Sequence, residues 1–383
     1  MGDPIPLCVP DLGPDEEAML VACIRSTFVS SVGPFVERFE REFAAAVGSP
    51  HAVACASGTA AIHLALRALG VGPGDRVLCN DCTFIASANP VLYQGASVEF
   101  IDSETRSWNL DPELVEAALA DGAAAGRPYK AVIAVHILGQ PADLGPIVAS
   151  CARHGAVLIE DAAEALGASY LDSYPHASCA GHQTGTIGTI GCFSFNGNKV
   201  MTTGGGGMCT TADPALAILL KHLSTQAKLP GAGFTHDAVG YNYRMPNVNA
   251  ALGLAQLARL PGFLARKHAI ADRYRAWAAR HGLVHHPVLP GTRSSDWLPS
   301  VLVPQRDAVM ASLNAAGVLA RPVWAPLGLQ PCYRERERER GARRWGGAVA
   351  ERIASHGLSL PCSVALEAQQ QDRVLAALDE ALP

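Results

Sequence analysis

The chain has 383 residues, of which 49% are hydrophobic and 17% are charged, and its formal net charge is −5. This composition can form a large core and excludes bulk disorder, and the length predicts one large domain and one smaller one. Because the sequence contains no basic stripe, we expect no nucleic-acid partner.

The N-terminus has no basic region followed by an apolar run, and no apolar stretch reaches membrane-spanning length. We therefore expect a cytoplasmic protein that does not contact a membrane. The eleven cysteines are scattered, and their odd number favours reduced thiols over a disulfide framework. Cys79 and Cys82 form one CxxC pair without a second ligand pair at a zinc-like spacing, so we expect no metal site.

Two amphipathic helices are predicted before the first strand. The helix expected over residues 14–27 begins with three acidic residues, which the helix dipole favours at that end. A turn at residues 30–34 leads into a second helix, which carries Phe35, Phe39 and Phe43 on one face.

Strands and helices then alternate up to residue 159. Strands are expected over residues 51–55, 76–79, 97–101, 131–135 and 156–159, and helices over residues 61–69, 85–93, 112–120 and 144–154. The strands are apolar throughout, which predicts a mostly parallel sheet covered by helices on both faces. In such sheets functional residues gather at the carboxyl ends of the strands. The candidates that follow a strand are Ser57, Phe84, His136, Asp161 and Lys199.

The most informative stretch is GCFSFNGNKVMTTGGGGM, residues 191–208. It opens as an apolar strand, presents Lys199 after a polar turn and runs into four glycines, which indicate a close approach to the backbone or a positive φ. An amine held in this way can form a Schiff base with an aldehyde cofactor if its surroundings favour the neutral form. A lysine on a glycine-rich turn without chemistry is the alternative.

Two other segments could serve the same cofactor. Residues 56–60, ASGTA, lie between a strand and a helix, where free backbone N–H groups point at an anion; Gly58 permits close approach and Thr59 adds a hydroxyl. Asp161 ends an apolar strand, and a buried carboxylate needs a partner such as a protonated pyridine nitrogen. The alternatives are ordinary helix caps at both places. Phe84 could lie over a flat ring or belong to the core.

The remainder of the chain predicts a second, smaller α+β domain. A helix over residues 214–224 and a polar, aromatic run over residues 236–249 precede a helical pattern from residue 250 to residue 281, which we expect to break at Pro261 and Gly262. Short strands (298–303 and 319–324) and helices (307–315, 347–356 and 366–382) follow. We divide the chain into a large domain, residues 1–255, and a small domain, residues 256–383. The alternating charges of residues 333–340 favour a solvated, mobile segment.

In combination, five motifs resemble the vitamin B6-dependent nucleotide-sugar aminotransferases of the DegT and StrS group. These motifs are ASGTAA, TFIASAN, EDAAEALGA, FSFNGNK with TTGGGGM, and GYNYRMPNVNAALG. The resemblance covers nearly the whole chain and is strongest to the legionaminic-acid and perosamine type, which aminates C4 of a 4-keto-6-deoxy nucleotide sugar. It implies the α/β fold of type I, with a mostly parallel seven-stranded sheet between helices and a smaller α+β C-terminal domain.

The resemblance also implies pyridoxal 5′-phosphate (PLP) as the cofactor and assigns residue roles. Lys199 and Asp161 would be catalytic, with Lys199 forming the Schiff base and Asp161 at the pyridine nitrogen. The implied cofactor-binding residues, besides these two, are Ser57, Gly58, Thr59, Ala60, Phe84, Glu164, Ser194, Asn196 and Asn242. The implied substrate-binding residues are Ser31, His136, Arg244, Arg321 and Trp324. Relatives of this type are homodimers with shared active sites, so Asn242 would contact the phosphate in the partner subunit.

The implied reaction is a ping-pong transamination from L-glutamate to a UDP- or GDP-linked keto-sugar. Amination at C3 or of a cyclitol stays open, and so does a regulator on the same fold, although no DNA-binding module is appended. A dehydratase of the same fold would lack the lysine. A dehydrogenase would use the glycines of residues 185–191, but that pattern precedes a strand instead of opening a helix. Residues 171–184 are longer than the usual connector and could reshape the sugar pocket.

Overall fold

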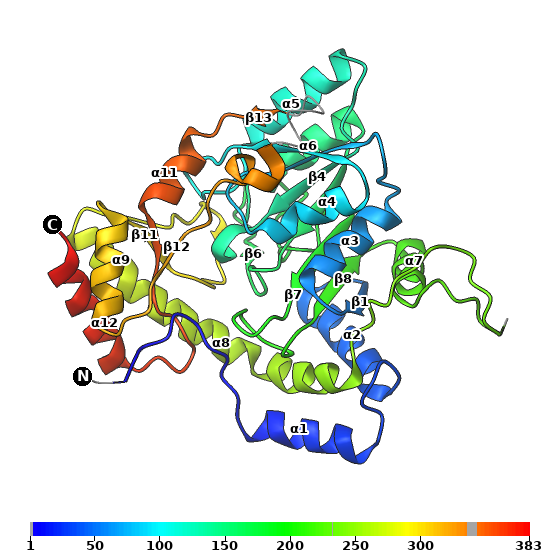
Figure 1. Ribbon diagram of the computed structural model, residues 1–383, viewed down its shortest axis with the longest axis horizontal. Coiled ribbons are helices and arrows are strands. Elements are labelled where there is room, and N and C mark those ends of the chain that lie inside the picture. Colours follow the sequence, from blue (N-terminus) through cyan, green and yellow to red (C-terminus); the bar gives the residue numbers. More distant parts are fainter. Residues whose placement is uncertain (1–2, 232, 335–342) are drawn as a thin grey trace.

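The computed structural model describes residues 3–231, 233–334 and 343–383. An eight-stranded sheet with the order β1-β8-β7-β5-β4-β2-β3-β13 forms its centre (Figure 1). Its strands are β1 (His51–Cys55), β2 (Arg76–Asn80), β3 (Ser97–Ile101), β4 (Ala131–Val135), β5 (Val157–Asp161), β7 (Ile190–Ser194), β8 (Gly207–Thr211) and β13 (Arg344–Trp345). Within this sheet β8 runs against the other strands. The mostly parallel sheet is therefore confirmed, with the two-residue β13 as an eighth strand where seven were expected.

Helices cover both faces of the sheet, as predicted (Figure 1). Side chains of α3 (Gly58–Ala68), α4 (Asn89–Tyr93) and α7 (Pro214–Ser224) share one core with the sheet. Those of α5 (Pro112–Ala124) and α6 (Leu144–His154) share a second core on the opposite face. Adjacent strand residues serve different faces, because Cys79 belongs to the first core and Leu78 to the second.

The helix expected over residues 85–93 is interrupted. Residues Ile85–Ser87 form a 3-10 turn, and α4 begins only at Asn89. Pro90 has no N–H to donate to the carbonyl four residues earlier, which explains why one continuous helix does not form.

The long helix α8 (Asn247–Arg280) crosses beneath the sheet and packs against α1 (Pro14–Arg25) and α2 (Pro34–Val47) (Figure 1). It continues through Pro261, so the predicted break is wrong. A proline inside a helix costs about 3 kcal/mol, and burial of large apolar side chains contributes about 2 kcal/mol each. Leu260 and Phe263, on either side of the proline, are buried in the same core as Phe39 of α2, and this packing offsets the cost.

The C-terminal region has its own antiparallel four-stranded sheet, with the order β12-β14-β11-β9. Its strands are β9 (Val284–His285), β11 (Ser300–Leu302), β12 (Arg321–Pro322) and β14 (Gly357–Ser359). The helices here are α9 (Arg306–Ala315), α11 (Ala348–His356) and α12 (Ala368–Ala381). A two-stranded antiparallel pair joins this region to the large sheet. Its strand β6 (Ser169–Tyr170) lies in the connection between β5 and β7, and its strand β10 (Thr292–Arg293) lies in the C-terminal region. The division after residue 255 falls inside α8 and stays a prediction.

The structure describes all of the long connector at residues 171–184 but only the start of the charge run at residues 333–340. Residues 171–184 pack against the start of α6, where the Tyr174 hydroxyl donates to Asp143 Oδ1 at 2.5 Å and accepts from the Gly145 N–H at 3.2 Å.

Most of the charge run at residues 333–340 lies outside the described residues. Its first residue, Tyr333, is buried against Phe100 and is therefore not solvated as expected.

All eleven cysteines are free thiols, and nine of them are buried, with Cys8 partly exposed and Cys332 exposed. Across the described ranges, none of the helices is both long enough and apolar enough to cross a membrane.

Candidate active site

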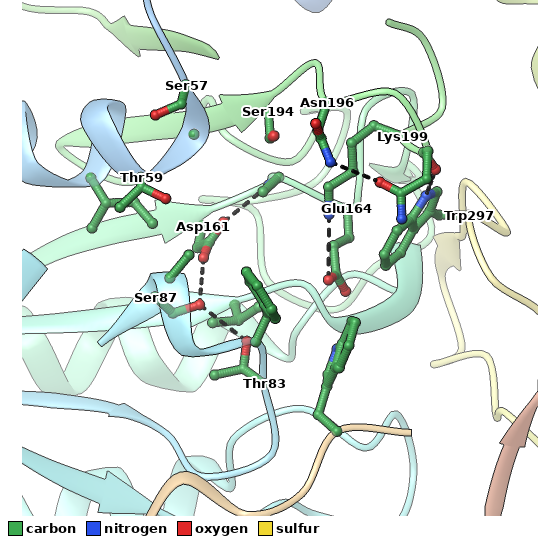
Figure 2. A pocket seen from close by; sticks show the side chains of 18 of the residues that line it. Ser57, Thr59, Thr83, Ser87, Asp161, Glu164, Ser194, Asn196, Lys199 and Trp297 are labelled. Carbon is green, nitrogen blue, oxygen red and sulfur yellow. Dashed lines mark hydrogen bonds and ion pairs between the residues drawn. The ribbon is translucent and has the colours of Figure 1, made fainter. Parts of the chain in front are cut away.

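A cavity of about 360 Å³ opens at the carboxyl edge of the parallel strands (Figure 2). It brings together most of the residues that the sequence placed after strands, including Ser57, Phe84, Asp161 and Lys199. The predicted residues Gly58, Thr59, Glu164, Ser194, Asn196, Arg321 and Trp324 line it as well. The edge of the sheet predicted from the sequence is therefore where the polar groups meet.

Lys199 extends from the turn after β7, and its side chain is 13% exposed. The amine lies 3.6 Å from Glu164 Oε1 and 3.9 Å from the centre of the Trp297 ring (Figure 2). Burial lowers the pKa of the Lys199 amine below its usual range, although the carboxylates of Glu164 and Asp161 act in the opposite direction. A lowered pKa increases the fraction of neutral amine, which is the nucleophilic and proton-accepting form.

The glycines after Lys199 allow backbones to approach closely, as predicted. A Cβ on Gly207 would lie 2.3 Å from the Ser57 carbonyl oxygen, and one on Gly206 would lie 2.3 Å from Thr203 Oγ1. Gly204 has a φ of +77°, which favours glycine. Larger residues here would push the lysine turn away from the start of α3.

Asp161 is the last residue of β5 and is 4% exposed. Its Oδ2 accepts a hydrogen bond from the Ser87 hydroxyl at 2.7 Å, and its Oδ1 accepts one from the Ala163 N–H at 3.1 Å (Figure 2). The Ser87 hydroxyl is in turn 3.1 Å from the Thr83 hydroxyl. Each carboxylate oxygen can accept more than one hydrogen bond, so Asp161 keeps acceptor capacity toward the cavity.

The first turn of α3 forms another wall. Ser57 caps this helix by accepting a hydrogen bond from the Ala60 N–H at 3.1 Å, so the interpretation of this residue as a helix cap is confirmed. A Cβ on Gly58 would lie 2.7 Å from Ser194 Cβ, and glycine is therefore needed for this approach. With Thr59 also lining the cavity, the turn offers N–H groups and a hydroxyl to an anion. Ala60 belongs to this turn but is buried and does not line the cavity.

The mouth of the cavity is aromatic and cationic. Phe84 is 50% exposed, with its ring 5.4 Å from that of Trp324, and the Arg321 guanidinium lies 4.6 Å from the Trp324 ring centre. Within the described part of the chain, Arg321 Nε and Nη2 and Trp324 Nε1 are buried without a hydrogen-bond partner. Burial lowers the pKa of Arg321, against the opposing effect of Glu164, but arginine remains charged near neutral pH. Unpartnered donors on a cation indicate a site for an anionic group.

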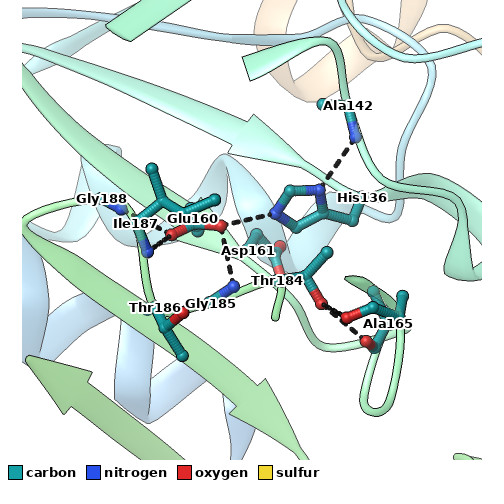
Figure 3. A network of polar contacts seen from close by, with 12 residues as sticks. His136, Ala142, Glu160, Asp161, Ala165, Thr184, Gly185, Thr186, Ile187 and Gly188 are labelled. Atoms are coloured by element: carbon teal, nitrogen blue, oxygen red, sulfur yellow. Dashed lines mark hydrogen bonds and ion pairs between the residues drawn. The ribbon is translucent and has the colours of Figure 1, made fainter. Parts of the chain in front are cut away.

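His136 does not line the cavity, in contrast to the implied substrate-binding role. Val135 lines the cavity, and the next residue of an extended strand points to the opposite side. There the Ala142 N–H donates to His136 Nδ1 at 3.0 Å, so the ring proton is on Nε2, which lies 3.0 Å from Glu160 Oε2 (Figure 3). The structure thus corrects the expectation, because His136 stabilises the sheet connections instead.

The glycine-rich segment 185–191, which a dehydrogenase would use to bind a dinucleotide, belongs to the same hydrogen-bond network as His136. The N–H groups of Gly185, Ile187 and Gly188 donate to the Glu160 carboxylate at 2.6 to 2.7 Å (Figure 3). Burial raises the pKa of Glu160, but His136 and these N–H groups outweigh burial and lower it below its usual range. Donors that are occupied in this way cannot bind a pyrophosphate, which argues against a dehydrogenase.

Three further predicted residues lie away from this chain's cavity. Asn242 is exposed, and its backbone forms a bridge with Thr225. Arg244 bridges to Cys55 through its backbone, and Ser31 lies in the connection between α1 and α2. None of the three lines the cavity formed by the described residues, so their roles stay predictions.

The cavity is also lined by three residues that were not predicted from the sequence: Thr83, Ser87 and Trp297. Thr83 and Ser87 flank Phe84 in the motif TFIASAN, so the motif contained a signal for them. Trp297 is separated from Lys199 by 98 residues in sequence (297 − 199), and no local pattern marks it.

An amine whose pKa is lowered by burial, in a cavity that also offers anion-binding groups, suits an enzyme that attacks carbonyl compounds carrying a negatively charged group. The chain matches the DegT/DnrJ/EryC1/StrS aminotransferase family over residues 10–379. It therefore belongs to that family, and it is an aminotransferase.

Individual relatives cover almost the whole chain. The GDP-perosamine synthase of Caulobacter vibrioides is 39% identical, over 99% of this chain and 98% of the relative. The UDP-N-acetyl-3-dehydro-alpha-D-glucosamine 3-aminotransferase of Acidithiobacillus ferrooxidans is 34% identical, over 90% of this chain and 87% of the relative. The crystal structure of the aminotransferase TlmJ from Streptoalloteichus hindustanus has a TM-score of 0.89 at 30% identity, covering 99% of this chain and 98% of that one. The fold type and the family resemblance found in the sequence are confirmed.

Proposed function

We propose that this aminotransferase uses PLP to transfer the amino group of L-glutamate to C4 of a UDP- or GDP-linked 4-keto-6-deoxy sugar. The observation that carries the proposal is that the Lys199 amine, the Asp161 carboxylate and the first turn of α3 meet in one cavity. The similarity to a GDP-perosamine synthase supports a sugar substrate aminated at C4.

The cavity residues fit PLP. The N–H groups of the first turn of α3, with Thr59 and Ser194, would bind the phosphate, and Gly58 lets Ser194 pack close to that turn. Asp161 would hold the proton on the pyridine nitrogen with its free acceptor capacity, and Phe84 would cover the ring. When bound, PLP supplies an electron-withdrawing ring and carries the amino group between the two substrates.

Lys199 would move the protons of the reaction. Its Nζ would take the proton from the α-carbon of glutamate and pass it to the cofactor carbon that keeps the nitrogen, and after 2-oxoglutarate has left it would carry a proton from that carbon to C4 of the sugar. Its lowered pKa supports the first role, because the base must be neutral. Glu164, at 3.6 Å, would hold the ammonium form that exists between the uptake and the release of a proton in each half-reaction.

Arg321 would bind the carboxylate of the amino donor. Its two unpartnered nitrogens match the paired oxygens of a carboxylate, and Trp324 Nε1 provides a third donor. We expect Arg321→Lys to raise KM for L-glutamate about 10- to 100-fold, because the paired hydrogen bonds are lost. The matched measurement is KM for the keto-sugar, which should stay within about twofold; equal increases in both values would contradict this assignment.

We further propose a cytoplasmic homodimer in which Asn242, Arg244 and Ser31 act at the cavity of the partner subunit. The exposure of Asn242 on a polar run supports this arrangement. Mixing the inactive variants Lys199→Ala and Asn242→Ala should restore activity, because one of the two cavities in a mixed dimer would then be intact. No recovery after confirmed subunit exchange would contradict shared active sites.

The position of amination can be measured directly. The protein would be incubated with PLP, 15N-labelled L-glutamate and, in separate reactions, GDP- and UDP-linked 4-keto-6-deoxy sugars and a UDP-linked 3-keto sugar. Nuclear magnetic resonance should place the label on C4. A 3-keto sugar accepted in preference, with the label on C3, would instead support the alternative suggested by the 3-aminotransferase relative.

A further inference from the structure

Trp297 touches the lysine turn at two points. Its ring centre lies 3.9 Å from the Lys199 amine, and its indole N–H donates to the Asn198 carbonyl at 2.6 Å. Asn198 immediately precedes Lys199, so one side chain contacts both the backbone that presents the lysine and the amine at its end. Figure 2 shows the Lys199 side chain with the Glu164 carboxylate and the Trp297 ring next to it.

Trp297 is itself held firmly. It is 1% exposed, and its carbonyl accepts hydrogen bonds from the buried Lys267 amine at 3.0 Å and from the Cys362 thiol at 3.2 Å. The preceding residue, Asp296, has a φ of +50° and is bonded to Arg275. This left-handed conformation is uncommon outside glycine, although aspartate tolerates it, and the contact with Arg275 helps to hold it here.

The same segment also fixes the other neighbour of the amine. The Ser295 hydroxyl donates to the Glu164 main-chain carbonyl at 3.1 Å, and the Ser295 N–H donates to the Gly139 carbonyl at 2.9 Å. The segment 294–297 therefore positions both the carboxylate and the ring that contact Lys199. It comes from the C-terminal half of the chain, whereas Lys199 belongs to the parallel sheet.

We propose that Trp297 is a positioning residue for Lys199, fixing its turn through the indole N–H and supporting the ammonium group through the ring face. This inference rests on the proposed function, in which the amine must leave the cofactor and return to it. The ring face stabilises the ammonium form, as cation–π contacts do, and keeps it in place opposite Glu164. The other titratable groups that act on the amine are Asp161 and Arg321 in the cavity and Cys8 behind the turn.

The test measures the pKa of Lys199 in the cofactor-free protein. The pH dependence of its reaction with an amine-specific reagent would be followed by mass spectrometry of the peptide that contains it. In Trp297→Leu, which lacks both contacts, we expect this pKa to fall by about 0.5 to 1.5 units. In Trp297→Phe, which keeps a weaker ring face, a smaller fall is expected. Trp277→Phe is the matched control, because Trp277 is also buried and donates its N–H to Asp379, far along the chain from the cavity.

A second measurement uses the PLP-loaded protein. We expect kcat for the glutamate half-reaction to fall about 10-fold in Trp297→Phe, with KM for glutamate within about twofold, because the amine is misplaced while the donor site is intact. If Trp297→Leu does not fold, Trp297→Phe decides both measurements. A Lys199 pKa and a kcat in Trp297→Phe that equal those of Trp277→Phe would overturn the proposal. A protein that binds no PLP would refute the proposed function and leave the pKa test of Trp297 valid.

Discussion

The ends of β4 and β5 carry buried polar groups on both sides, and the two sides differ in how fully those groups are bonded. On the far side from the cavity, Glu160 accepts four hydrogen bonds, three from backbone N–H groups and one from His136. On the cavity side, each oxygen of Asp161 accepts one. Glu160 and Asp161 are consecutive in sequence, so strand alternation alone separates a group bonded to the protein from one available to a ligand.

This difference separates structural from functional polar residues. A buried polar group whose hydrogen bonds are complete stabilises the fold. A buried polar group that lacks hydrogen-bond partners has an uncompensated desolvation free energy, which a bound ligand can offset. Arg321, with two unpartnered nitrogens, belongs with Asp161 on the functional side. This division can be tested by substitution, and the largest effect on stability is expected at His136.

We expect His136→Phe to lower the free energy of unfolding by about 3 kcal/mol, because it leaves the Ala142 N–H unpaired and removes a donor to a buried carboxylate. Denaturant unfolding measures the loss. In the remaining folded protein kcat/KM for both substrates should stay within about threefold of the wild-type value. Wild-type stability together with a large rise in KM for the sugar would instead restore His136 to the substrate pocket.

We expect Ser87→Ala to lower kcat about 10-fold with little change in stability, because Asp161 loses one of the hydrogen bonds that orient it toward the cavity. Steady-state kinetics and thermal unfolding measure the two effects. The control is Ser224→Ala, which removes a buried hydroxyl from the end of α7, bonded to the Lys221 carbonyl. If both variants lower stability equally and neither lowers kcat, Ser87 is a structural residue.

The smallest expected effects on stability are those of the two buried glutamates, Glu160 and Glu164, and they have opposite signs. The pKa of Glu160 is lowered in the folded state, so its contribution to stability is present at neutral pH and is lost as the pH falls through that pKa. Burial raises the pKa of Glu164 in spite of Lys199, so its contribution is present at low pH and is lost as the pH rises through that pKa. At pH 7, Glu164→Gln should stabilise the protein by about 1 kcal/mol or less, while Glu160→Gln should destabilise it. Thermal unfolding from pH 4 to pH 8 compares them, and changes of the same sign in both variants at pH 7 would contradict the assignment.

The sequence correctly predicted that the site lies at the carboxyl edge of the sheet, but it did not predict on which side of a strand each residue lies. Apolar strands followed by Ser57, Asp161 and Lys199 predicted where the site would lie, because parallel strands end at one edge. Whether a residue at a strand end faces the cavity depends on register by a single position, and for this reason His136 was misassigned. The registers of β4 and β5 became visible only in the structure.

Long-range contacts could not be predicted at all. Trp297 reaches Lys199 from a segment whose position depends on Lys267, Arg275 and Cys362, and no local pattern encodes that arrangement. The strand β8 was missed because it begins at the last glycine of the four-glycine run, at Gly207. Pro261 predicted a break that the packing of its helix overrides, which is a tertiary effect.

The central claim is that the Lys199 amine in this cavity carries out transamination, and a single-turnover reaction of the PLP-loaded protein with L-glutamate tests it most directly. The wild-type protein should release about one equivalent of 2-oxoglutarate per chain and lose the visible absorption of the lysine-bound cofactor. Lys199→Ala should fold normally and release it at least about 1,000-fold more slowly. Release of 2-oxoglutarate at the wild-type rate by Lys199→Ala, or none by the PLP-loaded wild type, would contradict the account.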